Sequence, residues 1–223
     1  MLNLAITGSF LLGCITTFTV VNLYNISLKD KTSAHENHQT RQQPETRTPN
    51  QPSGTDVSLA AFATLVYGAE VLIYIFLALT EMIPEEITAI MVAIPLVNYL
   101  QTIGIILTGL GYFLFIWAII IRGRYATSWI MAPRHRLVTA GPYRYTRHPS
   151  YLGYMLLFVG LPLTVPNPIM LVPLVGIYGY YKVTFREETL LTERFGEEFT
   201  KYQKRTGRFV PRLTRRKSSQ NAS

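Results

Sequence analysis

The residues best suited to chemistry lie in the carboxyl-terminal third of the chain. Two histidines, several arginines and tyrosines and a Gly-Pro turn stand together in the run HRLVTAGPYRYTRHPSYLGY, which begins at His135. An apolar stretch broken at Pro166-Asn167-Pro168 follows, and then the carboxylate pair Glu187-Glu188. Charge beside apolar segments is costly unless it has a partner or a substrate. This arrangement predicts an enzyme that handles a charged cofactor at the edge of a lipid phase.

Local signals place part of this run at the start of a helix. Pro149 suits the first helical turn and His148 stands directly before it, whereas Gly141-Pro142 marks a turn. Backbone N–H groups at a helix start can hold a carboxylate, and nearby aromatic faces suit an adenine ring. A basic loop with aromatic anchors at the membrane face is the simpler interpretation. It does not explain why two histidines and a helix start fall within seventeen residues.

These motifs resemble those of the isoprenylcysteine carboxyl methyltransferases. The family pattern is a histidine followed by LVT, then G-x-Y and RHPSY-x-G, all present between His135 and Gly153. The resemblance continues at the Asn167-Pro168 turn and in the pattern EExxL…FGEEF, which begins at Glu187. It covers about 75 residues, and residues 1–98 add hydropathy only.

The resemblance implies S-adenosylmethionine as the methyl donor, bound on the cytoplasmic side. In that family the cofactor contacts fall on the matched motifs, which here are Ser128, His135, Arg136, Leu137, Val138, Tyr143, His148, Pro149, Ser150, Tyr151 and Glu187. A carboxylate can bind ribose hydroxyls or an ammonium group, and aromatic faces suit a sulfonium cation. The implied acceptor is a lipophilic molecule, either a prenylated cysteine or another lipid, that enters laterally between helices.

One position departs from the family pattern. The eukaryotic members carry an arginine four residues before the first glutamate, where it would meet the substrate carboxylate, and here that position is Val183. We expect Arg186 and Arg205 to supply the catalytic cation instead, with Lys182 as a further candidate. Arg186 adjoins Glu187 and therefore faces about 100° away from it on a helix.

Other functions remain open. Gly109-Leu110-Gly111 looks like the G-x-G that phospholipid N-methyltransferases pair with a double glutamate, which suggests a lipid amine as acceptor. However, Gly104, Thr108 and Gly111 form a small-residue stripe that favours helix packing. An NADPH-dependent sterol-type reductase carries a similar RYSRHPNYxGE run, but Ser150 and Tyr154 replace its Asn and Glu. A membrane scaffold without turnover is the non-enzymatic alternative.

Hydropathy predicts an all-α integral membrane protein. Mean hydropathy is +0.20 and only 15% of residues are charged. A helical crossing takes about 20 apolar residues, which predicts five segments: 2–25, 58–80, 99–121, 149–165 and 167–182. The last two are short, so they form a tilted pair or a partly re-entrant hairpin. The expected organisation is an N-terminal transmembrane helix in 1–26, a flexible polar loop in 27–57, a methyltransferase domain in 58–217 with its motif core in 128–211, and a tail in 218–223.

Charge placement predicts the topology. All 21 Lys and Arg lie in the segments 29–57, 122–148 and 182–217. Basic loops face the cytoplasm, so we expect the amino terminus outside and the active site on the cytoplasmic side. The membrane would be the endoplasmic reticulum of a eukaryote or the cell membrane of a prokaryote. The net charge of +8 then reflects topology and anionic lipids, not nucleic acid.

Three further features concern single residues. Cys14 is the only cysteine, which excludes an intrachain disulfide. His135 and His148 lack a third ligand at metal-site spacing, so no metal is expected. Glu70 lies within an apolar segment, where it is either a functional group or a buried hydrogen-bond anchor.

Overall fold

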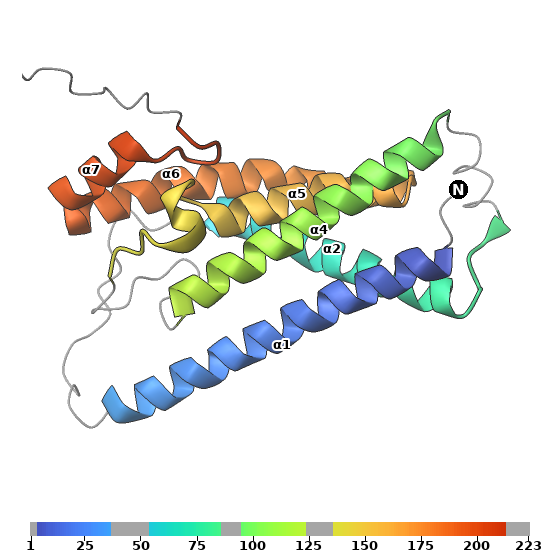
Figure 1. Cartoon of the computed structure of the whole chain (residues 1–223), viewed down its shortest axis with the longest axis horizontal. Helices are drawn as coiled ribbons and strands as arrows, with labels where there is room; N and C mark the ends of the chain where they lie inside the picture. The colour runs from blue at the N-terminus through green and yellow to red at the C-terminus, as the bar shows by residue number, and fades with distance from the viewer. Residues whose placement is uncertain (1–3, 37–53, 86–94, 124–135, 213–223) are drawn as a thin grey trace, which may run out of the picture.

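The computed structural model describes residues 4–36, 54–85, 95–123 and 136–212, and these residues are mainly helical (Figure 1). The elements in chain order are α1 (Leu4–Glu36), α2 (Gly54–Leu79), α4 (Val97–Arg122), the 3₁₀ helix η2 (Gly141–Arg144), α5 (Pro149–Thr164), the 3₁₀ helix η3 (Pro168–Leu174), α6 (Val175–Phe195) and α7 (Glu197–Arg205). Within these ranges no β-strand is formed, so the predicted all-α fold is confirmed.

Three of the described helices are long and apolar enough to cross a membrane. They are Ala5–Ser27 within α1, Gly54–Leu79 and Val97–Arg122, while the apolar helix α5 is shorter. The coarse prediction of an integral membrane protein is therefore supported by helix length and composition. The predicted segments 58–80, 99–121 and 149–165 correspond to α2, α4 and α5.

Two predicted boundaries are wrong. Helix α1 continues to Glu36 and α2 already begins at Gly54, so both ends of the expected loop 27–57 are helical; residues 37–53 lie outside the described ranges. The expected helix 167–182 instead opens as η3, and α6 starts only at Val175 and runs on to Phe195. Pro173 explains the late start, because proline lacks the N–H that an α-helix interior needs.

Small residues bring α4 and α5 into close contact. A Cβ added at Gly104 would overlap the backbone at Thr164, and one added at Gly111 would lie 2.9 Å from the Gly153 carbonyl oxygen. Thr108 lies between these two glycines on the same face and is fully buried. The predicted packing role of the small-residue stripe is thus confirmed.

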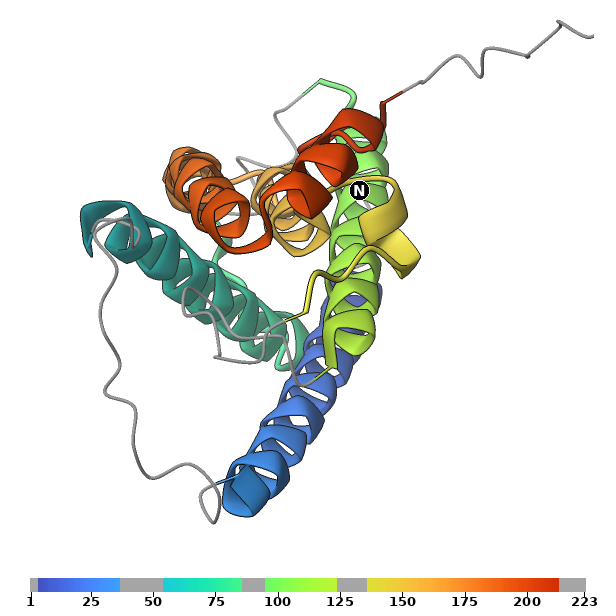
Figure 2. The same ribbon diagram turned by 90° about the vertical axis from the view of Figure 1, so that its left-hand side faces the viewer.

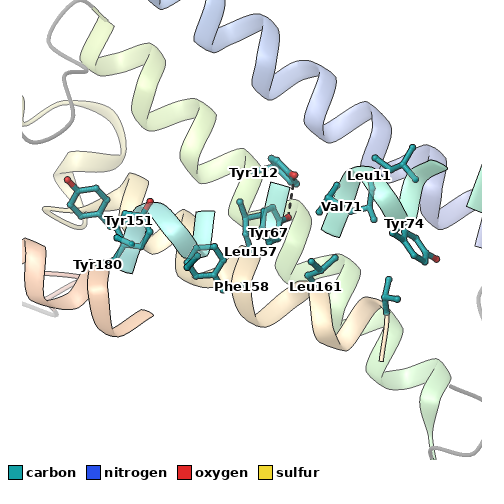
Figure 3. Packing of buried hydrophobic residues seen from close by; sticks show 14 of the residues in the cluster. Leu11, Tyr67, Val71, Tyr74, Tyr112, Tyr151, Leu157, Phe158, Leu161 and Tyr180 are labelled. Carbon is teal, nitrogen blue, oxygen red and sulfur yellow. Dashed lines mark hydrogen bonds between the residues drawn. The ribbon is translucent and has the colours of Figure 1, made fainter. Parts of the chain in front are cut away.

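The core lies where α2, α4, α5 and α6 meet. Helix α2 lies against α6, since a Cβ at Gly179 would lie 2.8 Å from the Ala60 nitrogen. Figure 2 shows α2 on one side of α5 and α6, with α4 and α1 on the other. Figure 3 shows Leu157, Phe158 and Leu161 of α5 packed in this cluster. The carboxyl-terminal part of α1 leans away from the other helices.

Candidate active site

The candidate site lies at one end of the bundle, where the end of α4, η2, the start of α5, the second half of α6 and α7 gather (Figure 1). Gly141 has φ of +58° and packs against Ile121, so a side chain there would be both strained and crowded. The Tyr202 hydroxyl of α7 donates a 2.6 Å hydrogen bond to the Tyr143 carbonyl. The site is therefore assembled from segments far apart in sequence.

His148 lies between the two glutamates of α6. It directly precedes α5, as predicted, and it is buried. Its Nδ1 lies 3.5 Å from Glu187 Oε2, and its Nε2 lies 3.1 Å from Glu188 Oε1. The Tyr151 ring lies parallel to the imidazole, with 5.6 Å between centroids. The imidazole can therefore act as a donor toward both carboxylates only when both of its nitrogens carry protons.

Electrostatics favour that charged state. Burial alone would lower the pKa of His148, but the Glu187 and Glu188 carboxylates outweigh burial and raise it. Burial likewise opposes ionisation of Glu187, yet His148 and Arg122 hold the pKa of that carboxyl below its usual value. The pKa of Glu188 is lowered strongly, because His148, Arg208 and Arg147 together outweigh its burial. These shifts favour two carboxylates and an imidazolium at the site.

Two buried polar atoms of the site have no hydrogen-bond partner in the described part of the chain. They are the Tyr143 hydroxyl and Glu187 Oε2. Burial raises the pKa of Tyr143, with Arg122 offsetting part of that rise, so the hydroxyl keeps its proton. Unpaired buried polar groups are costly and uncommon in proteins. A ligand with hydroxyl, ammonium or carboxylate groups would satisfy both atoms.

The structure brings together only part of the predicted cofactor set. Tyr143, His148, Pro149, Ser150 and Tyr151 are buried around the site, and Glu187 is half-buried beside them. Leu137 and Val138 are half-buried and Arg136 is exposed. Ser128 and His135 lie outside the described residues.

The predicted catalytic cations lie elsewhere. Arg186 Nε lies 3.4 Å from Asp56 Oδ2 of α2, and Arg205 is exposed on α7. Among the described residues neither forms a hydrogen bond or ion pair with Glu187 or His148. Val183, at the departing position, is buried in the core with an exposed fraction of 1%.

Three residues of this cluster were not predicted from the sequence. Arg122, at the end of α4, is close enough to Tyr143 and Glu187 to influence both carboxyl and phenol. Its signal was its place as the first basic residue after an apolar segment. Glu188 and Arg208 form a part-buried ion pair of 2.8 Å, although Glu188 could be taken for a solvated residue. No local signal joins two residues twenty positions apart.

Sequence comparisons extend the picture. Residues 100–198 match the phospholipid methyltransferase family. The protein-S-isoprenylcysteine O-methyltransferase B of Arabidopsis thaliana is 33% identical over 119 residues, which are 51% of this chain and 60% of that protein. The Homo sapiens protein-S-isoprenylcysteine O-methyltransferase is 37% identical over 79 residues, 34% of this chain and 28% of that protein. The similarity thus spans less than two thirds of either relative.

One solved structure is also similar. It is the eukaryotic intramembrane Ras methyltransferase, isoprenylcysteine carboxyl methyltransferase, with 24% identity and a TM-score of 0.46 over 71% of this chain and 53% of that one. Over about half of its length, the chain is therefore related in sequence to the isoprenylcysteine O-methyltransferases, as its motifs indicated.

Proposed function

We propose that this chain is a membrane methyltransferase that uses S-adenosylmethionine to methylate the carboxylate of a lipophilic acceptor, with an isoprenylcysteine as the first candidate. The observation that carries the proposal is the pair of buried atoms Tyr143 Oη and Glu187 Oε2, which have no hydrogen-bond partner among the described residues and lie beside the stacked rings of His148 and Tyr151. These groups match the polar and aromatic parts of such a cofactor. The sequence relation to isoprenylcysteine methyltransferases supports the same conclusion.

Each residue of the site has a defined task in this proposal. Glu187 accepts hydrogen bonds from the ribose hydroxyls or the ammonium group of the cofactor. The buried hydroxyl of Tyr143 donates a hydrogen bond to an acceptor on the cofactor. Arg122 balances the charge of Glu187. Tyr151 and His148 present ring faces. Ser128, His135, Arg136, Leu137, Val138, Pro149 and Ser150 complete the cofactor set by motif alone.

Methyl transfer to a carboxylate requires little acid–base chemistry from the protein. When bound, the cofactor would supply an electrophilic methyl group on a sulfonium and would leave as the neutral thioether S-adenosylhomocysteine once the S–CH3 bond breaks. An ionised carboxylate needs no general base to accept that methyl group. The residues must then align the acceptor oxygen in line, about 3–3.5 Å from the methyl carbon. The buried, water-poor surroundings of His148 and Tyr151 suit this task, because desolvation strengthens the electrostatic interactions that align the reactants.

The acceptor can be tested directly. Purified protein in lipid nanodiscs should transfer labelled methyl from S-adenosylmethionine to N-acetyl-S-farnesylcysteine, and the corresponding amide should accept none. If a carboxylate is the acceptor, neutralising Lys182, Arg186 or Arg205 singly should slow turnover at least about tenfold for one of them, or about 1.4 kcal/mol. Equal turnover in all three variants would point to Arg122 or to an uncharged acceptor.

A lipid amine is the second candidate acceptor. The match of residues 100–198 to the phospholipid methyltransferase family favours it. Methyl incorporation into phosphatidylethanolamine of the nanodisc, with none into the prenylcysteine, would select this alternative.

The finer topology also belongs to this proposal. Five membrane segments, with the amino terminus outside, would place all basic segments and the site in the cytoplasm. The membrane is then the endoplasmic reticulum in a eukaryote or the cell membrane in a prokaryote.

A further inference from the structure

We infer that Glu188 is a positioning residue: it latches a carboxyl-terminal strap, residues 206–210, onto His148 and so holds the imidazole against Glu187. The two adjacent glutamates would then have different roles: Glu187 contacts the ligand, and Glu188 positions His148 beside Glu187. This inference rests on the proposed function only where cofactor binding is concerned.

Glu188 has no capacity left for a ligand. Its Oε1 accepts from Arg147 Nε at 2.9 Å and Arg208 Nε at 3.0 Å, and it lies 3.1 Å from His148 Nε2. Its Oε2 accepts from Arg208 Nη2 at 2.8 Å and Gln203 Nε2 at 3.3 Å. A carboxylate offers about four lone-pair sites, and these five contacts occupy them. The side chain is only 7% exposed.

The strap is tied to the start of α5 by its backbone as well. The Arg147 amide donates to the Gly207 carbonyl at 2.9 Å, and the His148 amide donates to the Arg208 carbonyl at 3.2 Å. The Thr146 hydroxyl donates to the same Arg208 carbonyl at 2.6 Å. Gly207 is required here, because any Cβ would collide with the Val210 carbonyl oxygen. The strap therefore sets the backbone that carries His148.

Side chains complete the contact between strap and site. The Arg208 guanidinium lies 3.7 Å from the centre of the Phe185 ring, a close cation–π contact. The Phe209 ring lies 6.2 Å from that of His148 and 6.4 Å from that of Tyr181. Arg208 thus reaches α6 twice, through Phe185 and through Glu188, and Phe209 is left packed beside the imidazole.

Glu187 differs from Glu188 in its hydrogen bonding. Glu187 Oε2 is 3.5 Å from His148 Nδ1 and has no hydrogen-bond partner among the described residues. With His148 Nε2 fixed by Glu188, the other ring nitrogen can face only Glu187. The orientation of His148, and hence the position of the ligand-facing carboxylate, depends on the contacts that Glu188 makes with Arg208 and His148. We call these contacts the latch.

The test uses the full chain in nanodiscs and two readouts. Backbone hydrogen exchange at Arg147 and His148 reports the strap without any ligand. Titration calorimetry with S-adenosylmethionine and methyl transfer to N-acetyl-S-farnesylcysteine report the site. The variants are Glu188→Gln, Arg208→Gln and their double variant. Arg212→Gln, an exposed arginine four residues further along, is the matched control.

We expect Glu188→Gln and Arg208→Gln each to speed exchange at both amides about tenfold, and to weaken cofactor binding about tenfold, as loss of one charged hydrogen bond does. Turnover at saturating cofactor should stay within about threefold of the original rate, because the ligand-contacting groups remain. The double variant should match the worse single one, since one latch cannot be removed twice. Arg212→Gln should change neither readout.

Unchanged exchange at Arg147 and His148 in both single variants would overturn the latch. A normal cofactor affinity with faster exchange would overturn the link between strap and site. If Glu188→Gln does not fold, Arg208→Gln decides the question, because it keeps the carboxylate. Absence of cofactor binding by the unaltered protein would refute the proposed function instead, and the exchange readout would still decide the latch.

Discussion

At the residue scale, two carboxylates adjacent in sequence lie in different environments. Glu188 is buried among two arginines, His148 and Gln203, whereas Glu187 retains a buried oxygen without a hydrogen-bond partner among the described residues. Sequence motifs pointed to Glu187 because it follows the apolar hairpin, and they placed His148 at a helix start, which the structure confirms. The role of Glu188 could not be predicted, since it depends on Arg208 reaching back across the fold.

We predict that Glu187→Gln weakens S-adenosylmethionine binding about tenfold or more, because an amide lacks the charge that pairs with an ammonium or ribose group. His148→Ala should weaken binding similarly. Titration calorimetry on the detergent-purified variants measures both. Glu198→Gln on the exposed face of α7 is the control and should bind normally. Normal affinity in both site variants would contradict the assignment of these residues.

Stability should also depend on pH through His148. Its pKa is raised above the ordinary 6.5, so its pairing with the glutamates stabilises the fold fully below that pH and is lost as pH rises through the raised value. Glu188 acts oppositely: its lowered pKa adds stability above about 4.5, which is lost as pH falls. We expect the melting temperature to fall as pH rises above 6.5, and His148→Gln to flatten that fall. An identical slope in the variant would count against the charged cluster.

At the element scale, the hydropathy of the chain predicted α2, α4 and α5 well, because long apolar runs between charged segments leave few alternatives. It failed at the second half of the hairpin, where Pro168 and Pro173 impose a 3₁₀ turn before α6. It also ended α1 too early, since polar residues after Ile26 continue a helix that starts in an apolar segment. The composition of a segment therefore predicts whether it can be buried in a membrane, but it does not predict the residue at which its helix ends.

The contact between α4 and α5 yields a test of packing. Gly104→Ala should destabilise the protein by about 1–3 kcal/mol, because its Cβ has no space against the Thr164 backbone. Gly109→Ala on the same helix meets only an ordinary 3.5 Å contact with Phe10 and should be neutral or stabilising. Thermal unfolding in one detergent compares the two. Equal melting temperatures for both variants would show that α4 and α5 are not packed through this stripe.

At the scale of the whole molecule, the charge distribution predicts the topology. A reporter fused after Ser223 should read as cytoplasmic, and one before Met1 as external, because the proposed five-segment topology places all basic segments on one side. Removing the positive charges of residues 182–217 should shift that orientation, whereas Glu→Gln changes at the five glutamates of the same segment should not. A carboxyl-terminal reporter on the external side would contradict the cytoplasmic site.

The identity of the cofactor tests the proposed function most directly. A ligand that binds only the folded protein stabilises it and so raises its melting temperature. At a ligand concentration a hundred times the dissociation constant, the free energy of unfolding rises by about 2.7 kcal/mol. Purified protein should therefore melt higher with S-adenosylmethionine and unchanged with NADPH, and Glu187→Gln should remove most of the increase. Stabilisation by NADPH alone would make the chain a reductase, and stabilisation by neither would leave it without the proposed cofactor site.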